Sequence, residues 1–312
     1  MIYHLLILLA SSLLLSFSCK LLISGLGKIA RYLGWREFVV AFFVVAFASS
    51  APNLFVGLSA IKHGVPELSF GDVVGGNVVD LTLAVALATF FAKKLPAKSR
   101  TVQATSLFTI LVALLPLWLI LDGTLSRQDG LVLLFTFLCY MLWLFSDKER
   151  FSQKFQGRKP NKKNLLKDLG KVIGGIFLLG VASEGIVSCA RFLAEQSGMD
   201  ISLIGVLIVG LGNSLPEIYF SISSARAGDT WMILGDLMGS VIMPSTLVLG
   251  TVALINPIVI TDFSSFAIAR IFLIISALFF LYYIRTDKEI TKREAIFLLL
   301  LYILFLISEI VF

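Results

Sequence analysis

The sequence predicts an all-α polytopic membrane protein with ten transmembrane helices arranged as two inverted five-helix repeats. Three observations predict this fold class: an apolar composition, recurring apolar stretches, and a polar motif that occurs twice. Hydrophobic residues make up 58% of the 312 residues, charged residues make up 15%, and the mean hydropathy is +0.94. Ordinary soluble domains carry more charge, whereas apolar stretches of about 20 residues can cross about 30 Å of hydrocarbon.

Ten stretches of the chain are long and apolar enough to be candidate membrane spans. They lie at about 3–24, 37–61, 71–92, 103–121, 129–146, 169–193, 202–225, 232–254, 264–284 and 292–311. The first stretch is too long for a typical cleaved signal peptide and lacks a small-residue cleavage site. We therefore expect it to stay in the membrane.

The polar motif occurs twice, and the two copies correspond at one constant offset of 164 in the numbering. The first copy reads Ala-Ser-Ser-Ala-Pro-Asn at 48–53 and Gly-Asp-Val-Val-Gly-Gly at 71–76; the second reads Gly-Asn-Ser-Leu-Pro-Glu at 212–217 and Gly-Asp-Leu-Met-Gly-Ser at 235–240. A constant offset over two segments predicts an internal repeat.

The predicted organisation is a first repeat at 1–146, a basic linker at 147–168 and a second repeat at 169–312. Five spans are an odd number, so the second repeat enters the membrane with the opposite orientation. Inverted repeats are common in transporters, where the substrate site lies between the repeats near the bilayer midplane. The alternative is a duplication kept only as a scaffold.

The distribution of lysine and arginine predicts the orientation in the membrane. Basic residues follow spans one, three, five, seven and nine, whereas the loops on the other face carry few cations. Cytoplasmic loops carry the positive excess, so we expect a cytoplasmic linker and both termini outside the cell (inner or plasma) membrane. The net charge of +6 is then a topology signal. The expected partners are the lipid bilayer and inorganic cations, with no nucleic acid and no obligate protein partner evident.

The motif residues themselves indicate a cation site. Pro52 and Pro216 are each expected to free a backbone carbonyl, that of Ala48 and that of Gly212. Side-chain oxygens beside these two breaks come from Ser49, Ser50, Ser214 and Glu217. Such hard oxygen ligands suit Na⁺ or Ca²⁺. The alternative is a pair of proline kinks whose serines bond back to their own helix.

Glycines and one acidic residue add to the motif. Glycines at four-residue spacing, Gly71 with Gly75 and Gly235 with Gly239, predict close helix packing. Asp80 lies one turn after Gly76, within the third span. A carboxylate at this depth costs roughly 2.5–3.5 kcal/mol on insertion scales, which favours a functional role.

Other charged pairs obey the same offset. Asp72 and Asp236 follow a glycine at the expected start of a span, where we predict helix caps; the alternative is a role in attracting cations at the two mouths of the transport path. Lys20 and Glu184 also correspond. Lys20 is expected to reach toward the cytoplasmic face, and the alternative is a Lys20–Glu184 ion pair that controls sliding of the first and sixth helices.

The remaining features point to no enzyme and no cofactor. The three cysteines and two histidines are scattered, and no nucleotide-binding or nucleophile motif is present.

The two motif copies resemble the alpha repeats of the sodium/calcium exchangers, within the cation/calcium exchanger superfamily, and the resemblance covers the whole chain. It implies secondary active antiport by alternating access, most simply of Ca²⁺ against Na⁺. The residues that it assigns to the ion site are Ser49, Ser50, Asn53, Asp80, Asn213, Ser214, Glu217 and Ser240. Proton-coupled cation exchange, a passive cation channel and a transport-incompetent ion-binding sensor or scaffold remain alternatives.

Several positions depart from the family pattern. Asn53 stands at the first glutamate, Pro244 at a polar or acidic position, Asn213 at a threonine, and Asp72 and Asp236 at asparagines. Gly76 also replaces a usual serine. Only Asp80 and Glu217 remain as carboxylates at the expected ligand positions. The sequence therefore predicts a two-charge site with altered ion stoichiometry or selectivity.

Overall fold

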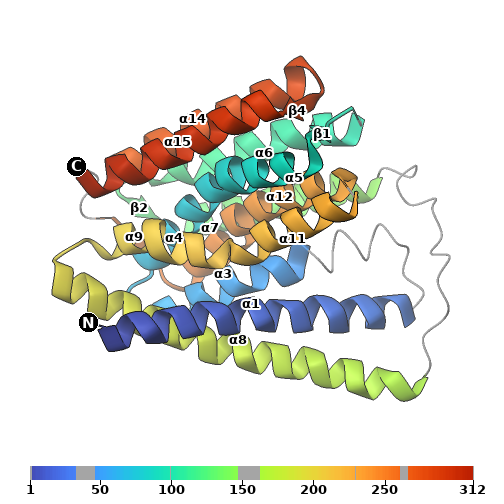
Figure 1. Cartoon of the computed structure of the whole chain (residues 1–312). Coiled ribbons are helices and arrows are strands. Elements are labelled where there is room, and N and C mark those ends of the chain that lie inside the picture. Colours follow the sequence, from blue (N-terminus) through green and yellow to red (C-terminus); the bar gives the residue numbers. More distant parts are fainter. Residues whose placement is uncertain are drawn as a thin grey trace.

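The helices form one bundle and run roughly along its length (Figure 1). The computed structural model describes residues 2–32, 46–98, 100–146, 162–228, 230–260 and 266–311. Within these ranges, eight helical segments are long and apolar enough to cross a membrane. The chain is therefore an integral membrane protein, and both termini lie at the same end of the bundle (Figure 1).

The first half of the chain contributes helices up to residue 146. They are α1 (Ile2–Tyr32), α3 (Ala46–Lys62), α4 (Glu67–Val79), the π-helical turn η2 (Asp80–Ala84), α5 (Val85–Ala92), α6 (Arg100–Leu119), the 3₁₀ turn η3 (Ile120–Asp122) and α7 (Arg127–Ser146). The segments α4, η2 and α5 follow one another without a break and form one long buried element.

The second half begins with the longest helix. Its elements are α8 (Lys162–Ser197), α9 (Ile201–Ile204), η5 (Gly205–Val209), α10 (Gly210–Asn213), α11 (Leu215–Ala227), α12 (Thr230–Met243), η6 (Pro244–Val248), α13 (Leu249–Ile255), α14 (Ala267–Thr286) and α15 (Lys292–Val311). The π-helical turns η2 and η6 start at positions 80 and 244, which correspond under the offset that relates the two motif copies.

Eight of the ten predicted spans correspond to these candidate membrane helices. The other two are the predicted spans 37–61 and 292–311. The first overlaps α3, but residues 33–45 lie outside the described part of the chain. The second coincides with α15, whose first turn carries Lys292, Arg293 and Glu294.

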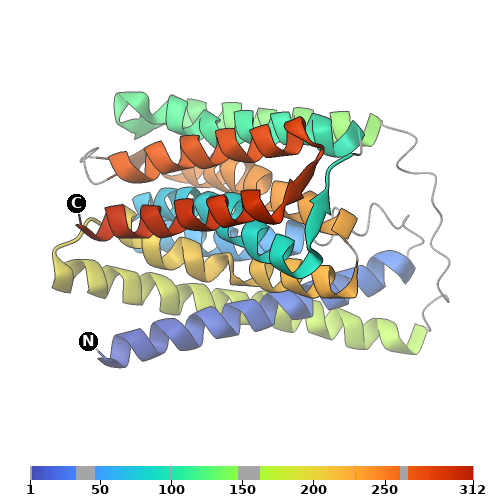
Figure 2. The same cartoon turned by 45° about the horizontal axis from the view of Figure 1, so that its top comes forward.

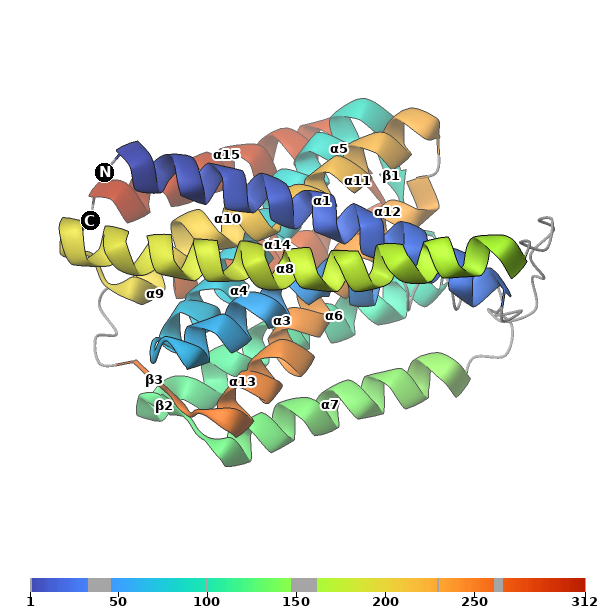
Figure 3. The same ribbon diagram turned by 90° about the horizontal axis from the view of Figure 1, so that it is seen from below.

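Two hydrophobic clusters divide the bundle into a central part and an outer layer. The larger cluster joins α4, η2 and α5 to α12, α13, α14 and α15. The second cluster joins α1 and α8 to α3 and α9. Figure 3 shows α1 and α8 crossing one face of the bundle, with α7 along one edge of this view. The two long helices therefore pack mainly on each other and on a limited part of the core.

Glycine allows α4 to approach η5 at backbone distance. A Cβ atom at Gly71 would collide with the carbonyl oxygen of Ser202, and one at Gly75 with that of Val206. The predicted close packing is confirmed for α4. At Gly235 an added Cβ would meet no described atom within 4 Å.

Two short antiparallel sheets lie at opposite ends of the bundle (Figures 1 and 2). In one, β1 (Lys94–Pro96) pairs with β4 (Glu289–Thr291). In the other, β2 (Thr124–Leu125) pairs with β3 (Ile258–Val259). Each sheet links one strand from the first half to one from the second, so segments far apart in the sequence are held together.

The two prolines act differently on their helices. The helix α3 continues through Pro52, so a full interruption there is not observed. The carbonyl of Ala48 nevertheless accepts a hydrogen bond from the Cys19 thiol at 3.2 Å, as a carbonyl freed by proline would. At Pro216 the helix does change: α10 ends at Asn213, and α11 begins at Leu215 with the proline in its first turn.

Candidate functional site

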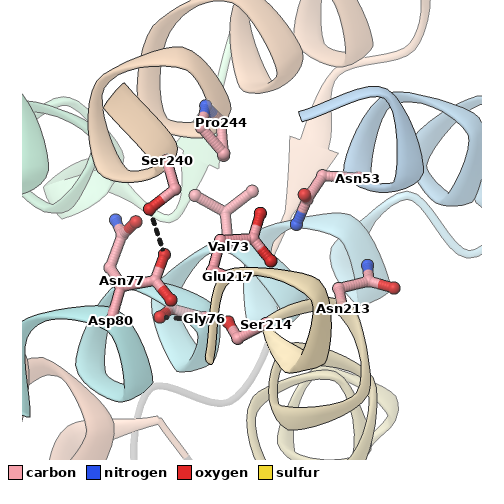
Figure 4. A pocket seen from close by; sticks show the side chains of 10 residues that line it. All are labelled: Asn53, Val73, Gly76, Asn77, Asp80, Asn213, Ser214, Glu217, Ser240 and Pro244. Atoms are coloured by element: carbon pink, nitrogen blue, oxygen red, sulfur yellow. Dashed lines mark hydrogen bonds between the residues drawn. The ribbon is translucent and has the colours of Figure 1, made fainter. Parts of the chain in front are cut away.

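A small buried cavity lies where α3, α4, α10, α11 and α12 meet (Figure 4). Its lining consists of two carboxylates, three amides, two hydroxyls and three residues without polar side-chain groups. They are Asp80, Glu217, Asn53, Asn77, Asn213, Ser214, Ser240, Val73, Gly76 and Pro244. Both halves of the chain contribute, and none of these lining residues is basic. The cavity therefore presents oxygen atoms and negative charge to whatever enters it.

The carboxylate of Asp80 is held by a serine from the other half of the chain. The Ser240 hydroxyl donates to Asp80 Oδ2 at 2.6 Å (Figure 4). The other oxygen, Oδ1, is buried and has no hydrogen-bond partner among the described residues. One carboxylate oxygen is thus fixed by the protein, whereas the other is free to bind a ligand.

Glu217 lies at the start of α11, beside the change in the helix. Only 3% of its surface is exposed, and its Oε2 atom has no hydrogen-bond partner in the described part of the chain. The Ser214 hydroxyl lies 3.5 Å from the carbonyl oxygen of Gly76, a long contact that leaves the hydroxyl adaptable. Ser214 alone separates α10 from α11, and its backbone stays in the right-handed helical region (φ −82°, ψ −2°), so Glu217 follows a one-residue interruption of the helix.

Asp72 does not cap a helix, so the role predicted for it from the sequence is wrong. The helix α4 begins at Glu67, directly after Pro66, so Asp72 lies in the second turn and is fully buried. Its Oδ2 atom accepts the Asn53 Nδ2 group at 3.2 Å, and both its oxygens accept the Asn213 Nδ2 group at 2.8 and 2.9 Å. Asp72 is therefore bonded to two residues that line the cavity.

Asp236 is also not a helix cap. It lies inside α12, half-way along the helix, and is buried with 8% of its surface exposed. Neither of its carboxylate oxygens has a hydrogen-bond partner among the residues that the structure describes. Asp72 and Asp236 thus correspond by sequence offset but differ in their environment.

Six of the eight predicted site residues line this cavity. They are Asn53, Asp80, Asn213, Ser214, Glu217 and Ser240. Ser50 is buried on α3 without a hydrogen-bond partner in the described ranges, but it is not among the lining residues. The side chain of Ser49 lies outside the described part of the structure.

Asn77 lines the cavity but was not predicted from the sequence. Its Nδ2 group donates to the Ser245 hydroxyl at 2.8 Å, which ties α4 to η6. The counterpart of Asn77 under the repeat offset is Val241, so the repeat comparison did not single it out. The repeat comparison did identify Asp72. Its role as a helix cap was predicted wrongly because the helix begins at Glu67 and not next to Asp72.

The predicted alternative of a Lys20–Glu184 ion pair is not observed. Lys20 Nζ lies 3.9 Å from the centroid of the Tyr219 ring on α11. Glu184 instead accepts Lys62 Nζ at 2.9 Å, and its other oxygen lies 3.5 Å from His63 Nε2. The surface pair therefore joins α8 to the end of α3. Lys20 is exposed, and its contact is a cation–π interaction.

The ligand set suits a hard cation that is bound reversibly. Carboxylate, amide and hydroxyl oxygens are the ligands of Na⁺ and Ca²⁺, and buried carboxylates are costly unless charge or hydrogen bonds compensate them. Within the described ranges, no group of three or more His, Cys, Asp or Glu side chains is arranged as a metal centre. The lining has two carboxylates, so its amide and hydroxyl oxygens are available as further, neutral ligands.

Comparison with known proteins agrees with this geometry. The family model described as "Sodium/calcium exchanger protein" matches residues 3–146 and 168–311, which is most of the chain. The chain belongs to the sodium/calcium exchanger family. The matched ranges cover both halves of the cavity and exclude residues 147–167 between them.

Individual relatives and solved structures agree with membership of this family. The chain is 26% identical to the sodium/calcium exchanger MaX1 of Methanosarcina acetivorans over 91% of this chain and 92% of the relative. Its fold resembles that of the sodium-calcium exchanger NCX_Mj, with a TM-score of 0.68, 24% identity, and 98% and 99% of the two chains covered. It also resembles an H⁺/Ca²⁺ exchanger, CAX, with a TM-score of 0.78, 18% identity, and 97% and 82% covered.

Proposed function

We propose that this chain is a secondary active cation antiporter that exchanges Ca²⁺ for Na⁺ by alternating access. The observation that carries the proposal is the buried, oxygen-lined cavity between the two halves, with Asp80 and Glu217 as its acidic residues. Membership of the sodium/calcium exchanger family supports it. The full proposed ion-binding set is Ser49, Ser50, Asn53, Asp80, Asn213, Ser214, Glu217 and Ser240.

The proposed architecture is ten transmembrane helices in two inverted repeats, at 1–146 and 169–312, joined by the linker 147–168. Two features support it besides the repeated motif. The starts of the turns η2 and η6 are related by the repeat offset. In addition, β1 and β3 start at 94 and 258, which are related in the same way, and they pair with different partners at opposite ends of the bundle. A two-fold relation between the repeats exchanges the two sheets.

The proposed orientation places both termini outside the cell (inner or plasma) membrane and the linker in the cytoplasm. The end of the bundle opposite the termini holds β1 and β4 (Figure 1). Basic residues gather around these strands at positions 93, 94, 98, 285, 288, 292 and 293. A positive excess of this kind is typical of the cytoplasmic face.

Alternating access in this proposal involves α1 and α8. These helices share their own hydrophobic cluster and pack against a limited part of the remaining bundle (Figure 3). Cation binding neutralises the buried carboxylates, and only then can the two long helices move across the cavity at low cost. An empty, charged site resists this movement because buried charge is expensive in lipid.

Proton-coupled Ca²⁺ exchange is the second candidate. The observation that favours it is the group of buried carboxylate oxygens without donors among the described residues: Asp80 Oδ1, Glu217 Oε2 and both oxygens of Asp236. Such oxygens can be compensated by a proton as well as by a metal ion. Both candidates use the same site and differ in the counter-ion.

Transport into proteoliposomes tests the proposal. Labelled Ca²⁺ uptake should require an outward Na⁺ gradient, whereas proton coupling would be revealed by uptake driven by a pH gradient without Na⁺. Glu217→Gln and Asp80→Asn should reduce uptake to the level of empty liposomes. Flux without any counter-ion would indicate a channel, and binding without flux would indicate a sensor or scaffold.

A further inference from the structure

Asp72 lies beside the candidate cation site, although the sequence did not predict it as an ion ligand. It is fully buried on α4 and accepts three hydrogen-bond contacts from two amides. One amide, Asn53, comes from α3 in the first half of the chain. The other, Asn213, comes from α10 in the second half. Asp72 therefore connects the two halves directly behind the cavity lining.

The repeat shows what is unusual about this arrangement. Under the repeat offset, Asn53 corresponds to Glu217 and Asp72 corresponds to Asp236. The second half thus has carboxylates at both positions, and three of their four oxygens have no hydrogen-bond partner among the described residues. The first half has an amide facing a carboxylate. Its negative charge lies at position 72, one hydrogen bond away from the cavity.

We propose that Asp72 supplies the cation site with the negative charge that Asn53 lacks, and that it positions Asn53 and Asn213 as neutral ligands. This inference rests on the proposed function, since it concerns the same cation site. With Asp72 included, three carboxylates contribute negative charge to the site: Asp72, Asp80 and Glu217.

The positioning follows from hydrogen-bond chemistry. An ionised carboxylate only accepts hydrogen bonds, so the NH₂ groups of both amides must face Asp72. Each amide oxygen is then directed away from Asp72. The Oδ1 atom of Asn213 is buried without a donor among the described residues, so no described protein group competes with a cation for it. The whole residue is enclosed, because only 1% of the surface of Asn213 is exposed.

The charge has a consequence that a purely structural hydrogen bond lacks. Two neutral amides leave the net charge of Asp72 in place, and the Coulomb energy of an ion near it scales with the charge of that ion. Removing Asp72 should therefore weaken Ca²⁺ binding more than Na⁺ binding. Loss of packing or of local order would weaken both to a similar degree.

Three full-length variants test the proposal. Asp72→Asn removes the charge but keeps hydrogen-bonding capacity, and the exchange Asn53→Asp/Asp72→Asn returns a carboxylate to the pair. Asp122→Asn, at an exposed position, is the matched control. The measured quantities are the half-saturating Ca²⁺ and Na⁺ concentrations in proteoliposomes, and the rise of Tm of the purified protein with added Ca²⁺.

We expect Asp72→Asn to raise the half-saturating Ca²⁺ concentration about tenfold or more, with a smaller change for Na⁺. The exchange variant should recover most of the loss, and the control should match the wild type. An equal change for both ions, no change, or no recovery by exchange would overturn the proposal.

Two further outcomes remain decisive. If Asp72→Asn yields no folded protein, the exchange variant is compared with the wild type alone: similar Ca²⁺ dependence supports the proposal, and weakened dependence or failure to fold overturns it. If the wild type shows no gradient-driven uptake, the proposed antiport fails, whereas the Ca²⁺-dependent Tm still reports whether Asp72 contributes to cation binding.

Discussion

The two halves of the site solve the problem of buried charge in different ways. In the first half, Asp72 is saturated by the amides of Asn53 and Asn213. In the second half, Glu217 Oε2 and both oxygens of Asp236 have no donor among the described residues. Buried polar groups are costly unless they are paired. The comparison teaches that the protein itself compensates Asp72 in the first half, whereas Glu217 and Asp236 in the second half, like Asp80 Oδ1, are left to a cation or a proton.

Loss of the carboxylate in the second half should have the largest effect. Glu217→Gln removes an acidic group of the cavity that the protein leaves uncompensated, so gradient-driven Ca²⁺ uptake should fall to the background of empty liposomes. Glu184→Gln is the control, because Glu184 is partly exposed and pairs with Lys62 at the surface. Substantial uptake by Glu217→Gln would show that the second half does not carry the cation.

Making the first half resemble the second should make folding depend on cations. Asn53→Asp removes a donor from Asp72 and places two carboxylates together. Leaving a buried charged group without its donor costs about 1–3 kcal/mol, so the ion-free protein should have a lower Tm. Added Ca²⁺ should restore more stability than in the wild type. Gln128→Glu is an exposed amide-to-carboxylate control; an unchanged Ca²⁺ response in Asn53→Asp would contradict the comparison.

Substitution by alanine should affect the two equivalent glycines, Gly71 and Gly235, to different degrees. Gly71→Ala brings a Cβ atom against the Ser202 carbonyl and should lower the free energy of unfolding by about 1–3 kcal/mol. Gly235→Ala meets no described atom within 4 Å and should have a smaller effect. Gly170→Ala on α8 is the open control. Thermal unfolding in detergent measures all three, and equal losses at Gly71 and Gly170 would refute the close contact.

The surface contact between α3 and α8 should matter least. Lys62→Met removes the 2.9 Å pair with Glu184, in which the Lys62 side chain is 70% exposed and that of Glu184 is 39% exposed. Exposed ion pairs contribute about 0–1 kcal/mol, so Tm and uptake should change little. A large loss of uptake with unchanged Tm would assign this pair to the movement of α8.

Much of the site could be predicted from the sequence because it lies on a repeated motif. A constant offset identifies corresponding positions without knowledge of their contacts, and a carboxylate within an apolar stretch marks itself by its cost. Asp80 and Glu217 were found in this way. Asn77 was not, because its counterpart Val241 is apolar. Asp72 was found but placed at a helix end, since the start of α4 at Glu67 depends on the turn that ends at Pro66.

Composition, apolar stretches and repeat spacing thus determined by themselves that the chain is a membrane protein with a duplicated polar motif, because these properties are local or periodic along the chain. The tertiary structure decided which side chains share hydrogen bonds. Asp72 meets Asn213 across 141 positions, and Asp80 meets Ser240 across 160, through the close approach of helices from the two halves. Such partners depend on helix start, rotation and crossing, and spacing in the sequence fixes none of these.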